Sequence, residues 1–443
     1  MIINVSYFFQ ILAKKLQDVL SVGSLAYTTD MWTDDHKHRT YTTVTGHWIE
    51  DWKLHNRVLT TEEFDSTLAK TGINVKEQLV DIFQALGLET DHLQNAIFTT
   101  DKGSNIVLAL KEEERLDCIN YVLNRVVQPS LEDKNAHKQI MDLLRSVKKL
   151  VRYVKKNSLQ DHFKKTLKQC NSTRWNSIYE MLKSVLEAYE DLQAVFALHK
   201  TSEMWRVLNI NYNLLKQLTD FLKPFFMATK VFEEEKKPTL HLVIPRMISL
   251  QNHCEITKLD PPALKELKKK ASAFIKEKFN PHILHKVAVF LNPWQKSMRA
   301  LSSEDQELVL DYVNEEIKSF PSKTEQVEEG PTPPAKKARY DDTFDDIVEE
   351  DQISEVQAYQ MQKVAPSEDK DVLGFWQGNE SNFPALAAMA RKVFAVMSTS
   401  SASERNFSLA GHVVSARRSS LKSSSVNNIL FLNSAIRAKR TRE

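Results

Sequence analysis

Apolar and polar positions change their spacing several times along the first part of the chain. Residues 1–23 place large apolar side chains every three or four positions, which predicts an amphipathic helix. Three runs rich in Thr, Val, Tyr and Trp follow at 24–30, 41–49 and 52–61, and this composition predicts strands. Because only two residues separate the second and third runs, we expect these two strands to form an antiparallel hairpin.

Helical spacing returns at 67–86, a short buried strand is expected at 95–100, and another helix begins at Ser104. Three strands, a helix and a fourth strand are the order in which an RNase H-like domain opens. From residue 112 to residue 319 the pattern is helical almost throughout and has no regular repeat. We therefore expect an α/β domain that is interrupted by a large all-α insertion.

The composition changes sharply between residues 320 and 371. This stretch is rich in proline and charge and poor in apolar residues, so it cannot bury enough surface to fold, and we predict that most of it is a disordered linker. Helical spacing resumes at 372 and continues almost to the end. The predicted parts are therefore 1–111, the first part of the α/β domain; 112–319, the helical insertion; 320–371, the linker; and 372–443, a C-terminal helical region.

Overall composition narrows the possible classes of protein. Only 9 of 443 residues are glycine, which is typical of a mainly helical chain with few tight turns. The 3 cysteines are odd in number and far apart, which favours a reducing compartment and excludes a disulfide framework. The net charge of +2 is small, so a DNA-binding surface would have to come from local clusters. We find no long apolar run and no leader pattern, and so expect neither a membrane span nor a signal peptide.

Two aspartates follow Thr-Thr pairs at the ends of predicted strands. Asp30 lies at the end of the first strand and Asp101 at the end of the fourth. Carboxylates at neighbouring strand ends can hold divalent metal ions, and Mg²⁺ prefers such oxygen ligands. Each aspartate can equally cap the turn or helix that follows it.

The C-terminal stretch 399–421 reads TSSASERNFSLAGHVVSARRSSL. It resembles the dimerisation region of hAT-family (hobo/Ac/Tam3) transposases and of the BED-finger host proteins derived from them. The resemblance implies that Asp30, Asp101 and Glu404 are the three catalytic carboxylates of an RNase H-like core, with Mg²⁺ or Mn²⁺ as cofactor if the chain is active. Ser401 and Glu404 also have the spacing of a helix capping box, which by itself explains a glutamate here.

A second motif, in NSTRWNSIYEML, is similar to the family's Thr-Arg-Trp motif. The resemblance implies that Arg174 and Trp175 contact DNA at the transposon end, where an aromatic plane beside a cation suits a flipped base. The alternative is a core tryptophan at the start of a long helix, with Thr173 as its N-cap.

Some motifs depart from the family's pattern. In CINYVLN, Cys118 matches the family but Tyr121 stands where a histidine is usual, and Asn292 replaces the aspartate of a later motif. Tyrosine cannot supply the protonatable imidazole, so these changes weaken the expectation of catalysis. No cysteine pair has zinc-ligand spacing, so we expect no structural zinc and no sequence-specific reading of DNA by a BED finger.

Basic clusters provide two further candidates. Eight lysines and arginines between Lys148 and Lys168 could contact phosphates without sequence preference, although a solvated helix face is the alternative. The short string around Lys336, Lys337 and Arg339 is typical of a nuclear-import signal in an exposed linker, and it predicts a nuclear protein.

The C-terminal region carries broad apolar faces that need a partner surface. That partner is the chain's own core, a second copy of the chain, or both. The resemblance implies dimerisation through residues of these faces, which we expect to be Phe383, Leu386, Met389, Ala390, Phe394, Phe407, Ile429, Leu430 and Leu432.

The sequence therefore supports three hypotheses about function. The first is a transposase-derived nuclear protein that forms homodimers or higher homo-oligomers, binds DNA and no longer transposes. The second is an active metal-dependent transposase or nuclease that cleaves DNA ends. The third is a protein-interaction scaffold without DNA binding.

Overall fold

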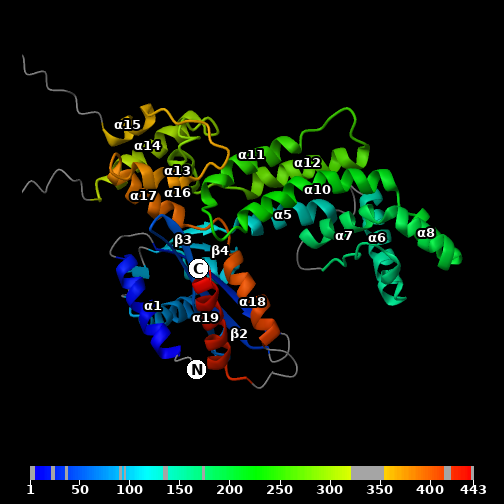
Figure 1. The fold of residues 1–443 in the computed structure, drawn as a ribbon, viewed down its shortest axis with the longest axis horizontal. Helices are drawn as coiled ribbons and strands as arrows, with labels where there is room; N and C mark the ends of the chain where they lie inside the picture. The colour runs from blue at the N-terminus through cyan, green and yellow to red at the C-terminus, as the bar shows by residue number, and fades with distance from the viewer. Residues whose placement is uncertain are drawn as a thin grey trace, which may run out of the picture.

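The computed structural model describes residues 5–20, 25–34, 38–88, 92–93, 96–132, 138–171, 175–320, 354–413 and 421–440. A small mixed β-sheet lies at the centre, with helices on both faces, and a long group of helices extends to one side (Figure 1). The fold is thus mixed α/β and mostly helical. In the described part of the chain no helix is both long enough and apolar enough to cross a membrane.

The sheet has five strands in the order β3-β2-β1-β4-β5. Its first three strands pair antiparallel, and β1, β4 and β5 run parallel to one another. The bounds are β1 Ala26–Thr33, β2 Thr40–Glu50, β3 Lys53–Glu63, β4 Ile97–Thr100 and β5 Glu114–Asp117. The sequence predicted the first four strands but not β5. That strand has four residues, of which only Leu116 is buried, so it offers almost no apolar pattern.

The hairpin between β2 and β3 turns at Asp51 and Trp52. Both residues have positive φ angles, 48° and 54°, as the tight turns that match strand twist require. Trp52 is a poor residue for this conformation, but its buried indole donates a hydrogen bond to Glu380 at 2.8 Å and lies under the guanidinium of Arg391 at 4.2 Å. Packing against the C-terminal helices thus fixes this turn.

Helices from the start of the chain cover one face of the sheet. They are α1 Val5–Leu20, α2 Gly72–Ala85 and α4 Ser104–Ala109. Their core includes Leu16, Val75 and Phe83 of the helices and Tyr27 and Phe98 of the strands, all nearly inaccessible to water. The predicted helices at 1–23 and 67–86 are thereby confirmed where the chain is described.

Helices from much later in the chain cover the opposite face. They are α13 Ile283–Leu291, α14 Ser303–Ile317, α15 Glu355–Met361, α16 Val372–Asn379 and α17 Pro384–Ala395. Trp376, Tyr359 and Phe394 fill this core, together with Ala26 and Ile97 of the sheet. α13 and α14 therefore share a core with the C-terminal helices, although the sequence assigned them to the insertion.

The helices that lie in sequence between β5 and α13 form an arm, which has a separate hydrophobic core (Figure 1). They are α5 Ile119–Glu132, α6 Lys138–Lys156, α7 Asn176–Glu187, α8 Tyr189–His199, α9 Trp205–Leu208, α10 Tyr212–Phe232, α11 Val243–His253 and α12 Pro262–Lys278, with short 3-10 turns at Leu159–His162, Thr201–Glu203 and Leu240–Leu242. The arm core is continuous from Ile119 to Ile275, as expected from the helical pattern.

The predicted linker needs a correction. Residues 321–353 lie outside the described residues, but 354–371 are structured and contain α15. Tyr359 of α15 is fully buried and donates a hydrogen bond to the carbonyl of Phe290 at 3.0 Å. Two buried side chains suffice to anchor this short helix, which is too brief to produce a clear period in a charged sequence.

The last two helices, α18 Ser401–Val413 and α19 Ser423–Arg440, pack beside β1, β2 and the edge strand β3. Side chains of α19 satisfy backbone amides of that edge. The amide of Val58 donates to Ser434 Oγ at 3.0 Å, and that of Thr61 donates to Asn427 Oδ1 at 3.0 Å. α19 therefore covers an edge that could otherwise pair with another chain.

Candidate functional site

Strands β1 and β4 place the two predicted aspartates beside each other. The parallel register pairs Thr28 with Thr99, so Asp30, within β1, and Asp101, the first residue after β4, each lie two residues beyond this pair. Side chains alternate along a strand, which puts Asp30 on the same face as Thr28, two residues before it. Asp101 directly follows β4 and has the same spacing from Thr99. Both threonines hydrogen-bond to the C-terminal segment 397–403. The two half-buried carboxyl groups thus share the face that this segment covers.

Helix α18 brings Glu404 to the same face. Its neighbour Ser403 is buried, and the Ser403 hydroxyl lies 3.2 Å from Thr28 Oγ1 and 3.4 Å from Thr45 Oγ1. Burial, and to a smaller extent the negative charge of Glu404, raises the pKa of the Cys118 thiol to about 11. Glu404 therefore lies near the start of α5 as well as over the sheet.

The three carboxyl groups do not form a metal-ligand set in this structure. Asp30 Oδ1 accepts a hydrogen bond from the amide of Met31 at 2.8 Å, and Asp101 Oδ1 accepts one from the amide of Gly103 at 3.0 Å. Within the described ranges, no group of three or more His, Cys, Asp or Glu side chains could hold a metal ion. Asp101 thereby stabilises the turn that follows β4. Asp30 does not end its strand as expected, because β1 continues to Thr33, and its bond to Met31 lies within the strand.

The CINYVLN motif lies between β4 and the C-terminal segment. The amide of Cys118 donates to the carbonyl of Thr100 at 2.7 Å, and the amide of Ile119 donates to that of Ser398 at 3.0 Å. Tyr121, in the first turn of α5, is half-buried. The motif therefore connects the strand that carries Asp101 to the approach of α18.

Trp175 is a core residue. Its side chain is 2% exposed and meets the Phe225 ring edge to face at 6.5 Å, and its amide donates to Asn124 Oδ1 at 3.3 Å. A buried indole presents no face to a nucleic-acid base in this conformation, which favours the core alternative, and the DNA contact of Trp175 stays a prediction. Arg174 lies outside the described residues.

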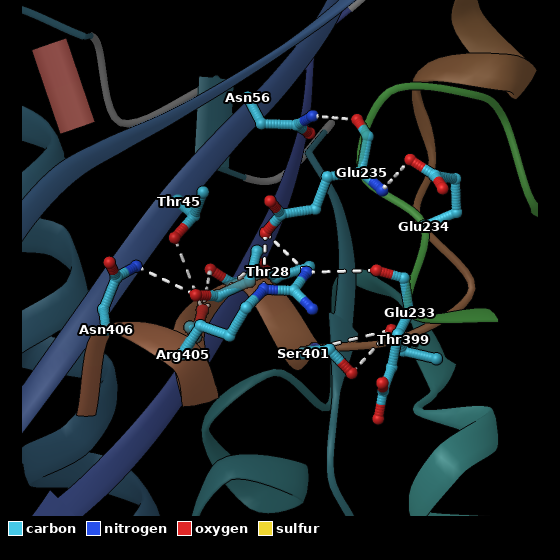
Figure 2. Close-up of polar contacts among 12 residues, drawn as sticks. Thr28, Thr45, Asn56, Glu233, Glu234, Glu235, Thr399, Ser401, Arg405 and Asn406 are labelled. Atoms are coloured by element: carbon cyan, nitrogen blue, oxygen red, sulfur yellow. Dashed lines mark hydrogen bonds and ion pairs between the residues drawn. The ribbon is translucent and has the colours of Figure 1, made fainter. Parts of the chain in front are cut away.

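A polar network joins α18 to the arm (Figure 2). Arg405 Nε donates to Glu235 Oε1 at 2.8 Å, and the same guanidinium donates to the Glu233 carbonyl at 3.2 Å. Asn56 of β3 donates to the Glu235 carbonyl, and Thr399 donates to that of Phe232 at 3.1 Å. Neither Glu235 nor Arg405 was expected from the sequence. The acidic run EEEKK and the arginine of SERNFS were the available signals.

His47 is another residue at this site that was not expected from the sequence. Its Nε2 lies 2.9 Å from Thr28 Oγ1, and its Nδ1 contacts Asn56 Oδ1. Complete burial lowers the pKa of His47 to about 4, despite the opposing hydrogen bond with Asn56, so the ring is neutral at pH 7. His47 therefore serves as a hydrogen-bonding link between β1, β2 and β3 beneath α18.

Most of the residues predicted to mediate dimerisation are buried within one copy of the chain. Phe383, Leu386, Met389, Ala390 and Phe394 are at most 6% exposed and belong to the core on the second face of the sheet. Their side chains already have partners, so a contact between copies cannot use them in this conformation.

The later members of the predicted set differ among themselves. Leu430 is buried, and Phe407 stacks on Trp32 with ring centroids 6.2 Å apart. Leu432 is half-buried, and Ile429 is 40% exposed. Of the nine predicted residues, only Ile429 and Leu432 present apolar surface on α19. Ile436, seven residues after Ile429 on the same helix, is 44% exposed.

Comparisons with known proteins identify two regions of the chain. Residues 28–125 match the ZBED1 RNase-like domain, and residues 355–436 match the hAT family C-terminal dimerisation region. The second match begins at α15, in agreement with the structured end of the predicted linker.

Three curated relatives extend the likeness. The chain is 28% identical over 285 residues to a Hobo transposase of Drosophila melanogaster, covering 64% of this chain and 42% of that protein. It is 26% identical over 499 residues to a putative AC transposase of Zea mays, covering 96% of this chain and 58% of that protein. It is 27% identical over 263 residues to zinc finger protein 618 of Mus musculus, covering 59% and 27%. The matched part thus spans at most 58% of the length of these relatives.

Proposed function

We propose that this chain, a relative of the hAT transposases that carries their C-terminal dimerisation region, is a transposase-derived nuclear protein that forms homodimers and binds DNA without transposing. The observation that carries the proposal is the matched segment 355–436 folded as α15–α19 onto the sheet that contains the RNase-like match. Both regions are thus present together in one folded unit.

We assign the α/β part to the RNase H-like class. Its sheet order β3-β2-β1-β4-β5, with an antiparallel first half and parallel β4 and β5, supports this assignment. Tyr121 and Asn292, which replace motif residues of the family, support the loss of transposition. The carboxyl groups of Asp30 and Asp101 are engaged by backbone amides, in agreement with a structural use of these positions.

Homodimerisation is tested through α19 rather than by deletion. Removing residues 372–443 would open the core around Trp376, so it would unfold the chain whatever the oligomeric state. The variant Ile429→Ser/Ile436→Ser changes two exposed side chains and is expected to convert dimer to monomer in light scattering. Leu259→Ser, at a position 93% exposed on the arm, is the matched control and should leave the dimer intact. A dimer of unchanged stability in the double variant would contradict the use of this face.

DNA binding is tested by titrating labelled duplex with the full chain at increasing salt. Because phosphate contacts release counterions, the logarithm of the binding constant should fall linearly with the logarithm of the salt concentration. No binding at low salt, with the dimer intact, would favour the scaffold hypothesis over this proposal.

The second candidate function is a metal-dependent nuclease. The side-by-side placement of Asp30 and Asp101, with Glu404 on the same face, favours it, and the absence of a three-ligand group among the described residues counts against it. Cleavage of hairpin-end DNA that requires Mg²⁺ or Mn²⁺ and is lost in both Asp101→Asn and Glu404→Gln would establish it. If the chain binds DNA but cleaves none under these conditions, the nuclease function is excluded and the first proposed function stands.

Nuclear location rests on sequence alone. The import string around Lys336, Lys337 and Arg339 lies outside the described residues. A fluorescent fusion of the full chain should enter the nucleus, and neutralising these three positions to glutamine should leave it in the cytoplasm. Nuclear entry of the variant would show that this string is not the signal.

A further inference from the structure

A cleft opens beside the polar network of α18. It has a volume of about 1540 Å³ and is bounded by β3, the end of α10, α11, the start of α16 and the C-terminal helices. This volume exceeds the range of about 300–1000 Å³ usual for small-molecule pockets. The cleft is therefore large enough for part of an extended polymer.

Positive charge dominates the described residues that line the cleft. They comprise nine lysines and arginines against four aspartates and glutamates. Lys53, Lys236, Lys237 and Arg246 are exposed, and the described part of the chain provides no ion pair for their charged groups. A cleft lined by one sign of charge focuses the electric field and attracts oppositely charged ligands.

Three of the four acidic side chains of the cleft have partners within the chain. Glu235 pairs with Arg405, and Glu234 accepts hydrogen bonds from the backbone amides of Glu235 and Lys236. Asp371 caps the start of α16 through the amide of Leu373. The lining therefore keeps an excess of positive charge, to which Lys236, Lys237 and Arg246 contribute.

Two buried polar atoms belong to residues that line the cleft. His241 is buried and 5% exposed, and its Nδ1 has no hydrogen-bond partner among the described residues. The same holds for Oε1 of Gln295. Buried polar atoms normally have partners, so their lack here indicates a site that water or a bound molecule completes.

We propose that this cleft binds the phosphodiester backbone of a nucleic-acid strand, with Lys236, Lys237 and Arg246 as the principal phosphate contacts. The proposal rests on the proposed DNA binding and gives it a location that none of the sequence motifs indicated. Ammonium and guanidinium groups form charge-assisted hydrogen bonds with phosphate oxygens. The cleft also adjoins α18, since Ala402 and Arg405 line it.

The competing surface is the basic face of α6, which the sequence also suggested. Lys148 and Lys149 are exposed on that helix, and Lys165 and Lys168 beyond it are paired with Glu187 and Glu180. An exposed helix face lacks the walls that focus a field, so we expect weaker phosphate binding there.

The test compares two double charge reversals in the full-length chain. Lys236→Glu/Lys237→Glu changes the cleft, and Lys148→Glu/Lys149→Glu makes the same charge change on α6. Fluorescence anisotropy with labelled duplex DNA, single-stranded DNA and RNA of equal length gives Kd over a range of salt, and circular dichroism checks that both variants fold. We expect the cleft variant to raise Kd at least tenfold and to reduce the salt slope by about 2, with a smaller effect from the α6 variant.

The outcomes separate this proposal from the proposed function. Binding by the unaltered chain that the cleft variant leaves unchanged, or that the α6 variant weakens as much, overturns the cleft site and leaves DNA binding standing. No binding of any nucleic acid by the unaltered chain overturns both. Loss confined to DNA or to RNA in the cleft variant supports the site and identifies which backbone it takes.

Discussion

At the scale of single residues, three histidines near the sheet are buried in their neutral form. Burial lowers the pKa of His47 and of His241 to about 4, and that of His285 to about 3, from an ordinary value of 6.5. All three rings are therefore neutral in the folded chain at pH 7. Between pH 6.5 and about 4 the unfolded chain binds protons that the folded chain does not, so the free energy of unfolding falls as pH falls.

The variant His47→Gln should weaken this dependence on pH. Glutamine retains hydrogen-bonding groups for Thr28 and Asn56 but does not titrate. Between pH 7 and pH 4.5 the variant should therefore lose about 2–3 kcal/mol less of its free energy of unfolding than the unaltered chain loses. Urea unfolding at both pH values measures the difference. His199→Gln, at an exposed position, is the control and should keep the original dependence. An unchanged pH dependence in His47→Gln would mean that this ring does not titrate in the window.

At the scale of elements, α19 acts as a cover for the edge strand β3. Its side chains accept hydrogen bonds from outward-facing amides that would otherwise lose their partners in a half-buried setting. The same helix carries the apolar face proposed for dimerisation. One element thus blocks strand pairing between copies and offers a helical contact in its place.

Asn427→Ala/Ser434→Ala should expose this edge. Each substitution leaves one backbone amide of β3 without its acceptor, at a cost of about 1–3 kcal/mol. Hydrogen exchange of the amides of Thr61 and Val58 should become faster, and aggregation on mild heating should increase. Asn428→Ala changes the exposed neighbour of Asn427 and should alter neither. Unchanged exchange at the two amides would show that α19 does not protect the edge.

At the scale of the whole molecule, the sheet serves as the meeting point of segments far apart in sequence. Its first face is covered by helices from residues 5–109, and its second by helices from 283–395. α15 lies within the second core, and Tyr359 contacts helices from both sides of the undescribed segment 321–353. Stability of this half of the protein therefore depends on contacts between distant parts of the chain.

Tyr359→Ala should destabilise the protein by about 3–5 kcal/mol, because a fully buried aromatic side chain leaves a cavity. Tyr359→Phe removes only the hydroxyl that bonds to Phe290, so about 1 kcal/mol should be lost. Met361→Ala, at a position 71% exposed on the same helix, should have little effect. Denaturant unfolding measures the free energy of unfolding of all three variants. Equal losses in Tyr359→Ala and Met361→Ala would show that the burial of Tyr359 does not stabilise this core.

Periodicity was enough to predict the elements with long, regular patterns. The strands β1–β3 and the arm helices have such patterns. β4 has only four residues, but all of them are buried, whereas β5 and α15 are short and too charged to show a pattern. The site was harder to predict because its residue types suit two environments. A tryptophan after an arginine fits a base-stacking site or a core, and only the tertiary packing of Trp175 against Phe225 decides between them. Lys236 and Lys237 of the cleft belong to an ordinary charge run, EEEKK, whose concave setting depends on β3, α16 and the C-terminal helices, all distant in sequence.

The cover of the second sheet face also sets an order of events during synthesis. The strands are complete by residue 117, but α17 and α18, which close over them, end at residues 395 and 413. Until that later stretch leaves the ribosome, Ala26, Ile97 and the threonines of β1 face water or other molecules. Contacts over such sequence separations form slowly, and exposed apolar strands are prone to aggregate meanwhile. The nascent chain is therefore a natural client for chaperones over almost 300 residues of translation, from about residue 117 to residue 413.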